Sequence, residues 1–104
     1  MTVYVDDWRQ RAKLGRFPGL WSHLMVSPDD DLAELHEFAA RIGMRREWFQ
    51  DKPWPRAHYD VPEFRRREAI RAGAVPIAWR EAGRMRLDAA ARRRRQRQQE
   101  ASAS

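Results

Sequence analysis

The chain contains no cysteine. That absence excludes a disulfide framework, a thiolate metal centre and a cysteine nucleophile. No apolar run approaches the length of a membrane span, and the first residues lack the basic and apolar regions of a signal peptide. We therefore expect a cytoplasmic protein with no membrane partner.

Two common catalytic motifs are also missing. The sequence has no glycine-rich phosphate-binding loop, and neither Ser22 nor Ser27 has the flanking glycines of a nucleophile elbow. The three histidines show neither zinc-finger spacing nor an H-x-x-x-H pair. A chemical site would therefore have to be assembled from residues that are distant in the sequence.

The positive charge is concentrated at the carboxyl end. The 104 residues carry a net charge of +6. Residues 80–104 contain eight arginines and three acidic residues, a contribution of +5, so residues 1–79 contribute only +1. Such a segment is either a solvated helix end or an arm that attracts phosphate groups, and the sequence leaves both readings open.

The first half of the chain predicts one strand and one helix. Residues 2–6 alternate in the manner of a strand, residues 8–20 read as a loop, and residues 21–26 form a second apolar run. A helix is expected over residues 28–42. Ser27 and Pro28 suit its first turn, and Gly43 suits its end.

The second half predicts a loop, two helices and a short strand between them. Prolines interrupt residues 47–57, which we expect to form an ordered loop with a short strand before it. A helix is expected over residues 61–72, with Asp60 as its N-cap. The run 74–79 contains Pro76, which favours an edge strand. A carboxyl-terminal helix then frays, leaving residues 101–104 disordered.

These elements predict an α/β fold, a small sheet with two or three flanking helices in a single domain. Residues 1–80 would form the compact α/β part. Residues 81–104 would form the Arg-rich helix and tail.

Few residues are able to carry chemistry, and most are expected at strand or helix ends. Asp6 follows the first strand, where a carboxylate can bind a divalent metal or serve a turn. His58 and Asp60 would share one face of an extended segment and form a metal pair or an acid–base pair. Capping alone would also explain Asp60. We expect Asp6, His58 and at least one of His23 and His36 to meet around one ligand.

These residues are candidates for two roles. The candidate catalytic residues are His58, Asp60, Asp6, His23 and His36, and the candidate metal ligands are Asp6, His58 and Asp60. His23 and His36 each have an alternative reading as packing residues.

Aromatic and basic residues supply a second candidate surface. Aromatic rings among basic side chains can stack bases and hold phosphates, although Trp54 could equally be a hydrophobic plug. We expect the other four tryptophans, Trp8, Trp21, Trp48 and Trp79, in the core. The candidate nucleic-acid-binding residues are Trp54, Arg56, Arg92, Arg93, Arg94 and Arg95.

Several segments resemble, in order, a family of short bacterial and phage proteins that is classed as a domain of unknown function. The matching segments are Val3–Asp7, Trp21–His23, Glu34–His36, Trp48–Gln50, His58–Asp60 and Ala72–Val75. The resemblance spans residues 2–80 and excludes the Arg-rich tail. It implies a shared small fold and transfers no established activity.

Two function classes follow from the sequence. The first is a nucleic-acid-associated hydrolase that cleaves a phosphodiester by metal-assisted or acid–base chemistry. The second is a non-catalytic nucleic-acid-binding or adaptor protein that uses the Arg-rich tail and the Trp54 loop. The sequence does not decide whether the protein is an enzyme.

Overall fold

The computed structural model describes residues 2–14 and 17–103. The strands are β1 (Val3–Asp6), β2 (Gln10–Leu14), β3 (Phe17–Val26), β4 (Phe49–Gln50), β5 (His58–Pro62) and β6 (Val75–Ile77). The helices are α1 (Leu32–Arg41), the short 3-10 turn η1 (Arg46–Trp48), α2 (Glu63–Arg71) and α3 (Trp79–Ala103).

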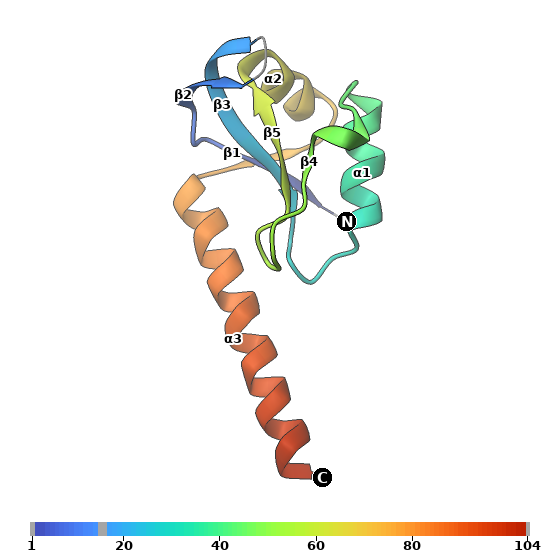
Figure 1. Cartoon of the computed structure of the whole chain (residues 1–104), viewed down its shortest axis with the longest axis vertical. Helices are drawn as coiled ribbons and strands as arrows, with labels where there is room; N and C mark the ends of the chain where they lie inside the picture. The colour runs from blue at the N-terminus through green and yellow to red at the C-terminus, as the bar shows by residue number, and fades with distance from the viewer. Residues whose placement is uncertain (1, 15–16, 104) are drawn as a thin grey trace.

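The strands form one mixed sheet in the order β4-β5-β3-β1-β6, and β2 also pairs with β3 (Figure 1). The long strand β3 is central because β5 pairs with one of its edges, while β2 and β1 pair with the first and last parts of the other edge. Pairing between β1 and β6 is parallel, and the other pairings are antiparallel. The sheet and its helices confirm the predicted α/β class.

One face of the sheet forms the hydrophobic core. Side chains alternate between faces along a strand, so β1, β3 and β5 each send every second residue to this side. Helices α1 and α2 cover it with Leu35, Phe38 and Ala69. Complete burial of a side chain such as Leu24 contributes roughly 2 to 3 kcal/mol. The strand residues in the core are Val3, Val5, Leu24, Val26, Tyr59 and Val61.

Helix α1 begins later than its sequence suggests. Its N-cap is Asp31, whose side chain accepts a hydrogen bond from the backbone N–H of Ala33 at 2.9 Å. Residues 27–30 instead form a turn, which the backbone bond from Asp30 to Ser27 closes. Gly43, with a φ of 83°, ends the helix as predicted, because glycine tolerates positive φ.

The loop predicted over residues 8–20 is wrong for most of its length. Residues 10–14 form β2, and β3 begins at Phe17. Gln10 and Arg11 are exposed, so β2 lacks the apolar alternation that would reveal a strand. Its pairing with β3 comes from backbone hydrogen bonds, and Gly15 and Arg16 between the strands lie outside the described residues.

The predicted N-cap of the second helix is also wrong. Helix α2 begins at Glu63 and its N-cap is Pro62, without a side-chain cap. Asp60 lies inside β5, opposite His23 of β3. The ladder between β3 and β5 continues to Pro62 and holds this segment extended, which leaves the Asp60 side chain available for other contacts.

The end of the chain is a strand followed by a long helix. Strand β6 lies at the edge of the sheet, as Pro76 predicts. The carboxylate Oδ1 of Asp7 accepts a 2.7 Å hydrogen bond from the backbone N–H of Trp79, at the start of α3. Figure 1 shows α3 running well beyond the sheet. It continues through Ala103, past the point where fraying is expected, and Ser104 lies outside the described residues.

Two of the tryptophans assigned to the core are exposed instead. Trp48 is 43% exposed and Trp79 is 50% exposed, whereas Trp21 is buried. Among the described residues, no helix combines the length and the apolar character that a membrane crossing requires.

Candidate metal centre

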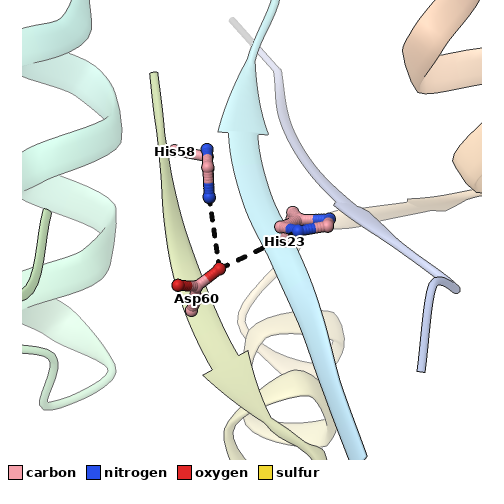
Figure 2. Close-up of side chains that lie close together, drawn as sticks. All are labelled: His23, His58 and Asp60. Atoms are coloured by element: carbon pink, nitrogen blue, oxygen red, sulfur yellow. Dashed lines mark ion pairs between the residues drawn. The ribbon is translucent and has the colours of Figure 1, made fainter. Parts of the chain in front are cut away.

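The face of the sheet opposite the core carries a cluster of histidine and aspartate side chains. His23 of β3 and Asp60 of β5 are register partners, and His58 lies two residues before Asp60 on the same face of β5. Figure 2 shows both imidazoles directed toward one oxygen of Asp60. The strand register therefore brings together residues that are 37 positions apart in the sequence.

The cluster is compact and reachable by solvent. Asp60 Oδ1 lies 3.2 Å from His58 Nε2 and 3.8 Å from His23 Nε2. One donor atom from each residue lies within 4.8 Å of the others. The side chains of His23, His58 and Asp60 are 20%, 17% and 26% exposed, so water or a ligand can reach them.

A backbone carbonyl fixes which ring nitrogen of His58 carries the proton. Its Nδ1 lies 2.7 Å from the carbonyl oxygen of Arg56. A carbonyl oxygen only accepts hydrogen bonds, so Nδ1 carries the proton. In the neutral imidazole, Nε2 then directs a lone pair at Asp60 Oδ1, which is also an acceptor.

His23 is held in the same tautomer by Asp6. Burial raises the pKa of Asp6, but hydrogen bonds from His23 and the backbone N–H of Trp8 outweigh it, and the pKa is lowered overall. Asp6 is therefore ionised, and its Oδ2 accepts a 2.7 Å hydrogen bond from His23 Nδ1. Its Oδ1 accepts the backbone N–H of His23 at 2.9 Å. Like His58, His23 keeps a lone pair on Nε2.

When both imidazoles are neutral, two acceptor nitrogens and one acceptor carboxylate oxygen therefore face one another. None of the three atoms carries a proton to donate. A divalent cation or a protonated imidazole would resolve this repulsion. Ligands 2.0–2.2 Å from a tetrahedral ion lie about 3.4 Å apart, close to the 3.2 and 3.8 Å found here. Two imidazoles and a carboxylate suit zinc and similar transition metals.

The groups around the cluster restrict how its side chains can move. The ring of Trp8 packs on His23 with centroids 4.9 Å apart, and the two imidazoles meet edge to face at 4.8 Å. The Nε of Arg66 donates a 2.9 Å hydrogen bond to the carbonyl of Asp6, which anchors the end of β1. Metal-binding histidines commonly have such an oriented second nitrogen, and both histidines here do.

His36 does not join the cluster. It lies on α1, on the core side of the sheet, where its Nδ1 is 2.9 Å from the hydroxyl of Tyr59. Phe49 packs edge to face against its ring at 4.6 Å. Burial and the nearby Arg46 lower the pKa of His36, so its neutral form is favoured. Its predicted catalytic role has no geometric support.

The structure thus unites four of the five candidate catalytic residues, Asp6, His23, His58 and Asp60. Asp6 was predicted as a metal ligand, but it reaches the donor set only through His23. His23, predicted as a catalytic residue, offers the third potential donor atom. The chemical roles of all four stay predictions.

The candidate nucleic-acid-binding residues differ in their contacts. The indole N–H of Trp54 donates a 3.0 Å hydrogen bond to the carbonyl of Pro28, and Arg93 covers its ring at 3.5 Å. Arg92 pairs with Asp29 at 2.6 Å. Arg93 therefore occupies one face of the ring that was predicted to stack a base, while Arg94 and Arg95 are exposed.

Sequence reasoning missed Arg86 of α3. It is half-buried, and its Nη2 contacts the sulfur of Met25, two residues after His23 on β3. A usable signal existed, because Ala82, Arg86 and Ala89 follow helical spacing and place an arginine between two small residues.

Comparison with known proteins identifies the family. No curated protein and no solved structure matches the chain. A family described as "Protein of unknown function (DUF4031)" matches residues 3–89, which include the four clustered residues and Arg86 and end before the run Arg92–Arg95. The match covers most of the chain, so this protein belongs to the DUF4031 family, whose function is not established.

Proposed function

We propose that this protein is a metal-dependent hydrolase of phosphoesters, with His23, His58 and Asp60 as the metal ligands. The supporting observation is the convergence of His23 Nε2, His58 Nε2 and Asp60 Oδ1, with both histidines held in the tautomer that leaves Nε2 free. Asp6 acts as the orienting partner of His23, and the carbonyl of Arg56 has this role for His58.

A zinc-class ion at this position would acidify a bound water and polarise a phosphoryl oxygen. Hydrolysis consumes one water. Its oxygen forms the new bond to phosphorus and keeps one proton, the ester P–O bond breaks, and the second proton passes to the departing oxygen. Three protein ligands would leave a coordination position for that water, as is typical of catalytic zinc sites.

Nucleic acid is the substrate class proposed for this site. The net charge of +6 and the arginines of α3 favour a polyanion over a neutral ester. A purely binding function is the second candidate, supported by the exposure of Arg94, Arg95 and Arg97 on the part of α3 beyond the sheet. Acid–base hydrolysis without metal is a third, in which a protonated His58 pairs with Asp60.

Metal titration separates these candidates. Purified protein stripped with a chelator would be titrated with Zn²⁺, Mn²⁺, Fe²⁺ and Mg²⁺ by calorimetry. His58→Gln and Asp60→Asn should each weaken binding of the preferred ion by at least about 100-fold, since each loses a ligand. His36→Gln is the matched control, because that histidine lies on the opposite face and should leave the affinity unchanged.

Activity would be measured on an activated phosphodiester and on single-stranded oligonucleotides. We expect turnover that depends on the ion and is abolished in both ligand variants. Metal binding without turnover would retain the site and reject the hydrolase. Absence of binding for all four ions would reject the metal centre, and metal-independent turnover lost in Asp60→Asn would then favour the acid–base mechanism.

A further inference from the structure

Arg86 occupies an unusual position on α3. Ala82 and Ala89 are fully buried, and Arg86 lies between them on the same side of the helix. Their burial shows that this side of the helix faces the protein body. An apolar side chain would be the ordinary occupant of the intervening position, yet the sequence places a guanidinium there.

The sheet residue under Arg86 connects it to the metal centre. Arg86 Nη2 lies 3.9 Å from the sulfur of Met25, which shares its face of β3 with His23. Met25 follows Leu24, the register partner of Tyr59, so it also neighbours His58 of β5. Residues two apart on a strand are separated by about 7 Å, so Met25, which the guanidinium contacts, lies one such step from His23.

Arg86 has no direct ion-pair partner within the described part of the chain. Among the residues that the structure describes, neither Arg86 nor Arg56 forms an ion pair. Burial lowers the pKa of Arg86; Asp6 opposes that change and Arg56 adds to it. The oxygens of Asp6 are already engaged by His23 and Trp8. An arginine stays protonated even so, and a half-buried guanidinium that forms no ion pair favours an anionic ligand.

We propose that Arg86 binds the phosphoryl group of the substrate beside the His23–His58–Asp60 centre. The inference rests on the proposed hydrolase and names the group it would recognise. A planar guanidinium presents paired N–H donors that match two phosphoryl oxygens. A phosphoryl group also offers a further oxygen for a metal ion, which a carboxylate with two oxygens does not.

Inorganic phosphate is the probe that tests this subsite. Its affinity would be measured by calorimetry on the full chain, with and without saturating Zn²⁺. The variants are Arg86→Gln, Arg86→Lys and, as a control of equal charge change, Arg84→Gln, an exposed arginine on the same helix. Loss of one charge-assisted contact should weaken phosphate binding by about 10- to 100-fold in Arg86→Gln. Arg86→Lys should fall between, and Arg84→Gln should match the wild type.

The design separates this proposal from the proposed function. Zinc affinity should be the same in the wild type and in Arg86→Gln, because Arg86 is not a ligand. If zinc binds but phosphate affinity ignores Arg86, the subsite is rejected while the metal centre stands. If zinc fails to bind, the phosphate affinities of metal-free Arg86→Gln and Arg84→Gln can still be compared. Equal affinities would then reject the subsite. Equal or tighter binding of acetate than of phosphate would overturn the phosphoryl assignment, and thermal melting verifies that each variant is folded.

Discussion

The two faces of the sheet carry different kinds of side chain on the same strands. On the core face, Leu24 and Tyr59 are almost completely buried beneath α1 and α2. On the other face, their immediate neighbours His23, His58 and Asp60 keep part of their surface exposed and direct polar atoms at each other. A single-residue step along β3 or β5 therefore separates a buried core side chain from a partly exposed polar one.

His36 and His58 lie on opposite faces of the sheet and differ in their surroundings. His36 on the core side has a hydroxyl partner and an aromatic neighbour, so its polar atoms serve packing. His58 on the open side has one nitrogen fixed by a backbone carbonyl and the other aimed at a carboxylate. Environment, more than residue type, decides which histidine can bind a ligand.

The largest effect should come from the core face. Leu24→Ala removes a fully buried side chain, and we expect a loss of about 2 to 5 kcal/mol in the free energy of unfolding. His58→Gln, one strand away on the open face, should change that free energy by less than about 1 kcal/mol. Urea denaturation of metal-free protein measures both. Equal losses would show that the two faces are not energetically distinct.

A second prediction concerns Asp6, which orients His23 on the open face, the face of the sheet opposite the core. In Asp6→Asn the amide oxygen can still accept the backbone N–H of His23, but the amide N–H₂ then faces His23 Nδ1. The imidazole would move its proton to Nε2 and lose its free lone pair. Zinc affinity should fall by about 10- to 100-fold although every ligand remains. Zinc titration of Asp6→Asn and of Asp7→Asn, its sequence neighbour, measures this, and equal affinities would contradict the orienting role.

Much of the fold could be predicted from local signals. The alternation of Val3 and Val5, the glycine that ends α1 and the proline in β6 each specify structure through short-range physics. Strand β2 could not be predicted, because its exposed polar side chains carry no alternation and its stability comes from pairing with β3. The N-cap assigned to Asp60 failed for the same reason, since strand pairing overrode a local capping pattern.

The candidate site was only partly predictable. Residue type and expected position were enough to single out Asp6, His23, His58 and Asp60. Their distances depend on the register between β3 and β5, which no short segment encodes. His36 was included because the sequence does not reveal which side of the sheet α1 covers. Arg86 was missed because its neighbours belong to β3, which lies far from it in the sequence.

A third prediction tests whether the exposed end of α3 contributes to stability or to nucleic-acid binding. Removing residues 94–104 spares the contacts of Arg92 with Asp29 and of Arg93 with Trp54. The free energy of unfolding should therefore change by no more than about 0.5 kcal/mol. If the helix end binds nucleic acid, the truncated protein should bind an oligonucleotide more weakly and with a shallower salt dependence. Unchanged affinity and slope in fluorescence anisotropy would mean that the segment is only solvated.

The smallest effect should be a pH dependence from the core-side histidine. Burial first, and then the positive charge of Arg46, lower the pKa of His36 in the folded protein from the usual value of 6.5. The unfolded chain therefore takes up the proton first as the pH falls through 6.5, so acid favours unfolding and the stabilisation is complete only above that pH. His36→Gln lacks this titration, and its melting temperature should fall less than that of the wild type between about pH 8 and 5.5. Both proteins would be compared without metal, which keeps ligand binding on the open face from contributing. If the melting temperatures of the two proteins changed equally with pH, His36 would titrate alike in the folded and unfolded chains. The surroundings of His36 would then give no electrostatic difference between the two faces.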